Sequence, residues 1–218
     1  MLRFAEEILL MALDEQSGRL HPLPERALEF ALAGAALADL VQLGRLGADT
    51  ATLEIKNRAP TGDPVLDVAL AALGKDDPQP SIQKALARVA LQAEPIKKLL
   101  FTELTSKGIL KQRDENYLWV LHERRYPTVD DREEREVRAR IREIVLTPGL
   151  APDARDVVLI GLMDACDLDS FVFTPEELTR HAERIRAICQ QNAIVHALAR
   201  AIGEIQRALL DVIANSGV

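Results

Sequence analysis

Apolar residues recur at helical spacing along most of the chain. Residues 2–12 place them every three or four positions and put Glu6 and Glu7 on the other face, which predicts a short amphipathic helix. From Pro24 to Gly44, leucines and alanines cover every face of a second helical segment. Such a segment is expected to be buried, with neighbouring helices close against its small side chains.

Helix-start signals divide much of the remaining chain. Four segments begin with a capping side chain, and in two of them a proline follows at the first helical position. These are Asp63 before Pro64, Ser81, Asp153, and Thr174 in the capping box Thr174-Pro175-Glu176-Glu177. The first three predict helices that end near residues 73, 91 and 165. Further helices are expected over residues 95–108 and 130–146 and through the last forty residues.

Two segments predict β-hairpins. Residues 50–56 alternate apolar and polar side chains, and Leu46 begins their expected partner; residues 109–112 and 117–121 are expected to pair across a charged turn at 113–116. Each hairpin follows a helix, which is the outline of a winged-helix unit. The predicted fold is mainly α, a single helical domain over residues 1–218. Its winged-helix-like units fill residues 1–126, and residues 127–218 form a helical part.

Composition narrows the function classes. The 218 residues are 48% hydrophobic but only 4% aromatic, so the core must be aliphatic, and the formal net charge of −7 speaks against a nucleic-acid binder. Cys166 and Cys189 are expected to be reduced, buried thiols. Glu6 and Glu7 interrupt any signal peptide, and no apolar stretch is long enough for a transmembrane segment. We expect a cytoplasmic protein, and any membrane contact to be peripheral, on the inner membrane face.

Sequence motifs of catalysis are absent. The strings typical of serine hydrolases, phosphate loops, dinucleotide folds and zincins do not occur. The four histidines and two cysteines lack the paired spacing of a zinc site. The sequence therefore predicts a protein that is not an enzyme and has no metal site and no cofactor.

A small basic and apolar group of residues is the remaining candidate site. Lys97 and Lys98 stand on one predicted helix, and an apolar segment follows in the second hairpin: Tyr117, Leu118, Trp119, Val120 and Leu121. Positive charge beside an apolar edge is the combination that peripheral membrane binding uses. The same residues also fit a structural role, in which Trp119 anchors the core and the lysines only solubilise the surface.

Five strings carry a family pattern. They are Phe4-Ala5-Glu6-Glu7, Gly18-Arg19-Leu20, Gly44-Arg45-Leu46, Pro60-Thr61-Gly62-Asp63 and Lys107-Gly108-Ile109-Leu110. Together they resemble the Golgi phosphoprotein 3 family, including its shorter bacterial members, from the first residues to about Leu162. The resemblance implies a mostly helical single domain with short hairpins. It also implies a non-enzymatic peripheral protein that binds the phosphatidylinositol 4-phosphate head group and self-associates through a hairpin.

The resemblance also implies where a lipid site would lie. The family's head-group tryptophan falls near Pro24 of this sequence, and the arginine that follows it falls at Ala33. Two further arginines of the family fall near Glu94 and Lys97, so that only Lys97 keeps the positive charge. Lys97 and Lys98 are therefore the predicted head-group residues. Residues 117–121 are predicted to make the self-association or membrane contact.

The leading hypothesis is a non-enzymatic peripheral membrane adaptor that docks on anionic lipid head groups. Its expected partners are anionic phospholipids and, through the hairpin, a second copy of the chain. Two alternatives remain from the residues alone. One is a soluble homo-oligomeric scaffold without lipid binding, and the other is a winged-helix DNA-binding regulator.

Overall fold

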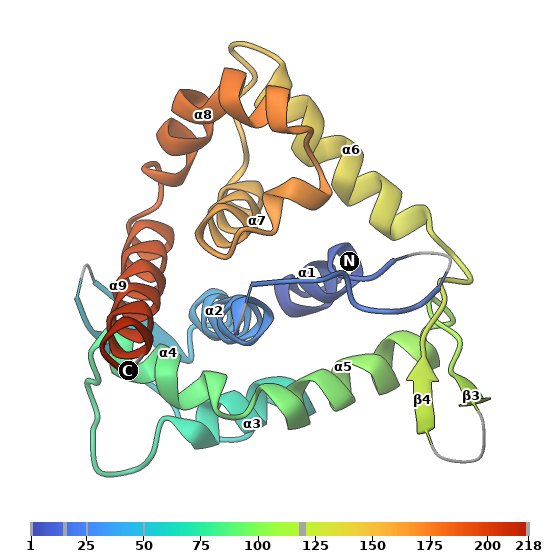
Figure 1. The fold of residues 1–218 in the computed structure, drawn as a ribbon. Helices are drawn as coiled ribbons and strands as arrows, with labels where there is room; N and C mark the ends of the chain where they lie inside the picture. Colours follow the sequence, from blue (N-terminus) through green and yellow to red (C-terminus); the bar gives the residue numbers. More distant parts are fainter. Residues whose placement is uncertain (1, 15–16, 25, 50, 118–120, 217–218) are drawn as a thin grey trace.

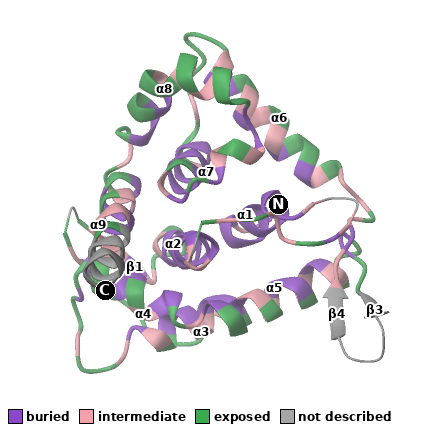
Figure 2. Ribbon diagram, viewed as in Figure 1, coloured by how far each residue is buried: buried purple, intermediate pink, exposed green. Residues whose placement is uncertain are grey.

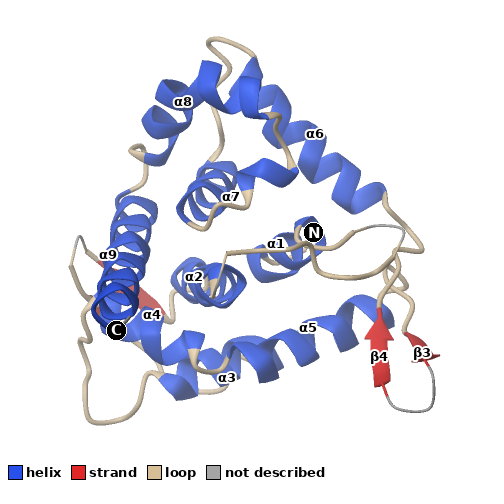
Figure 3. Cartoon of the chain, in the orientation of Figure 1, coloured by secondary structure: helices blue, strands red, loops and turns tan. Residues whose placement is uncertain are grey.

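The computed structural model describes residues 2–14, 17–24, 26–49, 51–117 and 121–216, and it describes side chains except at 113–124, 206 and 208–216. Its helices are α1 (Phe4–Met11), α2 (Ala27–Gln42), α3 (Pro64–Ala72), α4 (Ile82–Ala90), α5 (Ala93–Ser106), α6 (Arg132–Leu146), α7 (Ala154–Ala165), α8 (Pro175–Cys189) and α9 (Ala193–Ser216). The strands are β1 (Leu46–Ala48), β2 (Leu53–Ile55), β3 (Arg113–Tyr117) and β4 (Leu121–Arg125). The mainly α fold class is confirmed (Figure 3).

Three helices form the centre of the molecule. Figure 1 shows α1, α2 and α7 enclosed by α3, α4 and α5 on one side and by α6, α8 and α9 on the others. All eight residues of α1 are buried, and Figure 2 shows most of α2 and the middle of α7 buried as well. One hydrophobic core joins residues from every one of these helices, so the C-terminal helices pack directly on the first half of the chain.

Two glycines allow the central helices to approach closely. A methyl group added at Gly34 of α2 would lie 2.6 Å from Cδ2 of Leu162 on α7. One added at Gly161 of α7 would lie 2.0 Å from Cγ1 of Val195 on α9. A carbon atom at either distance overlaps its neighbour, so Leu162 or Val195 would have to shift to make room for it.

The glutamates of α1 lie inside the protein, and the prediction that they line an outer polar face is wrong. Glu6 is fully buried and accepts a hydrogen bond from Lys107, while Glu7, 4% exposed, pairs with Arg155 at 2.7 Å. Burial raises the pKa of Glu7 in spite of Arg155. For Glu6, burial acts in the same direction, but the bonds from Lys107 and Arg3 outweigh it and lower the pKa.

The predicted caps are confirmed. The Asp63 carboxylate accepts from the backbone N–H groups of Val65 and Leu66 at 2.9 and 3.1 Å, and Thr174 forms its capping box with Glu177. Asp63 also pairs with Arg3. The Pro60-Thr61-Gly62-Asp63 string therefore starts α3 and ties it to the chain just before α1.

The first predicted hairpin is confirmed as β1 and β2, but the second is displaced along the sequence. Residues 113–116, predicted as the turn, belong to β3, whose register with β4 runs from Arg113 opposite Arg125 to Tyr117 opposite Leu121. Residues 109–112 form no strand of this hairpin: Leu110 makes an isolated antiparallel bridge to Thr128, and both Ile109 and Leu110 are buried in the core. The segment after α5 thus pairs with the residues that follow β4, and the hairpin itself begins farther along the chain.

The ends of α2 and α5 have the same geometry. The Arg45 N–H bonds the Leu40 carbonyl at 2.9 Å, and the Ile109 N–H bonds the Leu104 carbonyl at 3.0 Å. Gly44 and Gly108 precede these donors with φ of 66° and 74°, the left-handed conformation that glycine adopts readily. The two helix-and-hairpin units, α2 with β1–β2 and α5 with β3–β4, therefore resemble each other in the way their helices end.

Candidate functional site

Lys97 and Lys98 stand on the same helix, α5, but the structure places them differently. The Lys97 side chain is 24% exposed and lines two adjoining cavities. Lys98 is exposed and lines neither of them. Neighbouring residues on a helix point about 100° apart, because one turn takes 3.6 residues. Of the two predicted head-group residues, the cavity surface thus includes Lys97 alone.

The first of these hollows, called here the Lys97 cavity, has a volume of about 270 Å³. It lies where the first turns of α2 and α5 meet the segment that precedes α2. Its walls are aliphatic and its rim is charged: the lining residues are Leu20, His21, Leu23, Pro24, Arg26, Leu28, Glu29, Leu32, Ala93, Glu94 and Lys97.

Both cations of the Lys97 cavity have a carboxylate partner. Arg26 Nε lies 2.7 Å from Glu29 Oε2, and Lys97 pairs with Glu94. The cations are the more enclosed members, with 31% of the Arg26 side chain and 24% of the Lys97 side chain exposed, against 41% for Glu29 and 67% for Glu94. Charges of both signs are therefore available on the wall of one small hollow.

Arg26 is held in place by more than its ion pair. Its guanidinium lies 5.1 Å from the centre of the Phe30 ring, a cation–π contact. Its backbone is left-handed, with φ of 64°, a conformation that costs a non-glycine residue about 1–2 kcal/mol. The backbone conformation and the ring contact together fix the direction of the Arg26 side chain, just before α2 begins.

The second hollow connects Lys97 to the base of the β3–β4 hairpin. Its volume is about 570 Å³, and its lining residues are Leu13, Gly18, Arg19, Leu20, Lys97, Phe101 and Tyr126. Tyr126 directly follows β4 and stacks on Phe101, with ring centres 3.9 Å apart. Lys97 and the base of the hairpin therefore share one surface of the protein.

The predicted apolar hairpin segment is described only in part. Tyr117 ends β3 and Leu121 begins β4, and the two face each other in the register. Leu118, Trp119 and Val120 lie outside the described residues. Figure 1 shows the two strands extending away from the helices beside the end of α5.

Arg26 is the charged lining residue of this cavity that sequence reasoning missed. Pro24, Glu94 and Lys97, three of the positions given by the family resemblance, line the same cavity. The fourth, Ala33, is fully buried inside α2. Arg26 supplies the second cation of the cavity from seven residues earlier in the chain. The only signal in the sequence is that Arg26 and Glu29, like Glu94 and Lys97, stand three residues apart.

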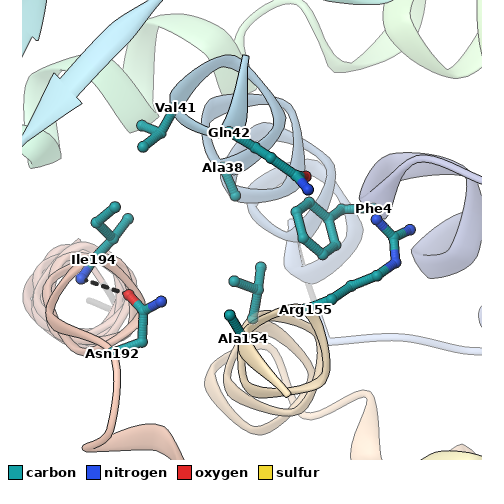
Figure 4. A pocket seen from close by; sticks show the side chains of 9 residues that line it. Phe4, Ala38, Val41, Gln42, Ala154, Arg155, Asn192 and Ile194 are labelled. Atoms are coloured by element: carbon teal, nitrogen blue, oxygen red, sulfur yellow. Dashed lines mark hydrogen bonds between the residues drawn. The ribbon is translucent and has the colours of Figure 1, made fainter. Parts of the chain in front are cut away.

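Another hollow, of about 180 Å³, lies between α2, α7 and the start of α9 (Figure 4). Phe4, Val158 and other apolar side chains form most of its wall. Two of its polar side chains serve the fold: Asn192 Oδ1 accepts from the Ile194 N–H at 2.9 Å, and Arg155 pairs with Glu7. This hollow therefore resembles a packing defect more than a charged binding site.

Three further findings concern chemistry. Within the described part of the chain, no group of three His, Cys, Asp or Glu side chains could hold a metal ion. No helix there is both long and apolar enough to cross a membrane. Cys166 and Cys189 are free and buried as predicted, and burial raises the pKa of both thiols, that of Cys189 to about 12.

Comparison with known families gives one decisive match. The family model described as Golgi phosphoprotein 3 (GPP34) matches residues 4–205, from α1 into α9. The chain belongs to the Golgi phosphoprotein 3 family. The family predicted from the five strings is thus confirmed, and the match continues well beyond Leu162, where the resemblance between strings ended. Golgi phosphoprotein 3 is not known as an enzyme family.

Proposed function

We propose that this Golgi phosphoprotein 3 family member is a peripheral membrane protein that binds lipid head groups of anionic membranes through the Lys97 cavity. The β3–β4 hairpin beside the cavity would make a second contact, with the membrane or with another copy of the chain. The observation that carries the proposal is the position of Lys97, which lines both the charged cavity and the hollow bounded by Tyr126 at the base of the hairpin.

The chemistry of the cavity supports this function. A phosphate group can receive two parallel N–H donors from Arg26 and a point charge from Lys97. The aliphatic wall, which includes Leu20 and Leu23, lowers the local dielectric and so strengthens these contacts. Because the whole chain carries a net charge of −7, attraction to an anionic surface depends on contacts with individual cationic side chains and not on the overall charge. Binding is therefore expected to weaken as salt screens it.

Vesicle co-sedimentation tests the proposal. We expect the protein to sediment with phosphatidylcholine vesicles that contain phosphatidylglycerol, to stay in solution with phosphatidylcholine alone, and to be released by high salt. Lys97→Glu should abolish sedimentation. Lys84→Glu is the matched control, since Lys84 makes the same charge change on α4, where it is 53% exposed and pairs with Asp77.

Two results would contradict the proposal. Absence of binding to acidic vesicles at low salt, where attraction is strongest, would remove the membrane function. An equal loss in Lys97→Glu and Lys84→Glu would show that overall charge, and not the cavity, controls the binding.

A further inference from the structure

The Lys97 cavity combines features that a receptor for a simple anion does not need. Its two cations, Arg26 and Lys97, are already neutralised by Glu29 and Glu94, so the charges of these four side chains sum to zero. A purely anionic ligand can still contact the two cations, but it leaves Glu29 and Glu94 without a new partner and beside a new negative charge. A ligand that carries both signs would instead offer a new partner to every group that it displaces.

We propose that the Lys97 cavity binds the head group of an aminophospholipid, in which a phosphate is linked to a primary ammonium group. This inference rests on the membrane function proposed above and names its lipid class. Arg26 and Lys97 hold the phosphate oxygens. Glu29 and Glu94 accept hydrogen bonds from the ammonium group, and their greater exposure leaves them within reach of a ligand at the rim.

The lining residues favour a primary ammonium over the trimethylammonium group of choline. A trimethylammonium group has no N–H donor, and proteins recognise it with cages of aromatic rings. Among its described lining residues, the Lys97 cavity has two carboxylates and one histidine but no Phe, Tyr or Trp. Charge-assisted hydrogen bonds are therefore the recognition that this cavity offers, and only an ammonium with N–H groups can make them.

The test varies the amine at constant anionic charge. Vesicles hold a fixed fraction of phosphatidylglycerol, and the remaining lipid is either phosphatidylcholine or phosphatidylethanolamine. The wild-type protein should bind the ethanolamine vesicles about two- to fivefold more tightly, the effect of exposed ion pairs of this kind. In the double variant Glu29→Gln, Glu94→Gln this preference should disappear, while binding to ethanolamine-free vesicles is retained.

A matched control separates head-group recognition from effects of the bilayer. Glu136→Gln, Glu143→Gln removes two exposed carboxylates of α6 and should keep the ethanolamine preference. If Glu29→Gln, Glu94→Gln also keeps it, ethanolamine acts through lipid packing and the inference is wrong. Equal binding of the wild type to both vesicles would refute the aminophospholipid and leave the membrane function standing.

A soluble ligand distinguishes failure of the cavity from failure of the membrane function. Glycerophosphoethanolamine, and not glycerophosphocholine, should shift the NMR signals of residues around Lys97. Such shifts without any vesicle binding would support the cavity assignment and remove the membrane function. Absence of both would overturn the two proposals together.

Discussion

Asp39 makes the stability of this protein depend on pH in an unusual direction. Its side chain lies in the middle of the core on α2, only 5% exposed. One carboxylate oxygen accepts from the Phe4 N–H at 3.5 Å, and the other has no hydrogen-bond partner among the described residues. Burial raises the pKa of Asp39 to about 7, although the Phe4 N–H and the guanidinium groups of Arg155 and Arg3 act against it.

The raised pKa sets the sign and the size of the effect. A carboxyl group that binds its proton more tightly in the folded state adds stability at low pH, and this stability is lost as pH rises through the folded pKa. Between the ordinary value of 3.8 and about 7, the full loss is about 4 kcal/mol. Of this, about 2–3 kcal/mol is lost between pH 5 and pH 8.

Asp39→Asn isolates this contribution because the amide keeps the shape and stays neutral. Relative to the wild type, the variant should become more stable by about 2–3 kcal/mol on going from pH 5 to pH 8. Urea unfolding at several pH values measures the difference, and the other titrating groups cancel in the comparison. The exposed control Asp49→Asn should show no trend, since the Thr52 and Ala51 N–H groups hold the pKa of Asp49 below its usual range.

A constant difference between Asp39→Asn and the wild type across this pH range would refute the reasoning. It would mean that the Asp39 carboxyl group does not change its protonation between pH 5 and pH 8. A change in the urea m value would instead indicate an altered unfolded or native state.

Three other predictions concern packing and assembly. Gly161→Ala should destabilise the protein by about 1–3 kcal/mol through its clash with Val195. Val195→Ala should relieve part of this cost in the double variant. If urea unfolding gives strictly additive changes in the free energy of unfolding, the close approach is contradicted. Ala35→Glu places an unpaired charge at a fully buried position and should abolish cooperative thermal unfolding; a stable, cooperatively folding variant would be the opposite result. If the hairpin mediates self-association, light scattering should give a lower mass for Trp119→Asp than for the wild type, and equal masses would argue against it.

The elements that sequence reasoning predicted correctly are those with local causes. Asp63 and Thr174 cap helices because the groups they bind lie within three residues, so the spacing alone reveals them. The buried character of α2 also follows from its own composition, since leucines and alanines occupy every face.

The elements that it missed depend on distant residues. Beyond the local Arg3, Glu6 pairs with Lys107, and Glu7 pairs with Arg155; these partners lie about 100 and 150 residues away, and helical periodicity does not reveal them. The Lys97 cavity forms only where α2 meets α5, so no local pattern around Arg26 revealed that it lies near Lys97. The second hairpin was displaced for a similar reason, because residues 109–111 pair with residues 127–129 and not with 117–121.

The central position of α1 has a consequence for how the protein is made. A ribosome releases this helix first, and Arg3 can pair with Glu6 at once. Glu7, however, has no cationic partner until Arg140 and then Arg155 have been synthesised. Native burial of α1 before that point would leave the Glu7 charge unpaired in an apolar interior, which is strongly unfavourable. The nascent chain must therefore keep its first helix loosely docked until α7 emerges, and folding is completed late in translation.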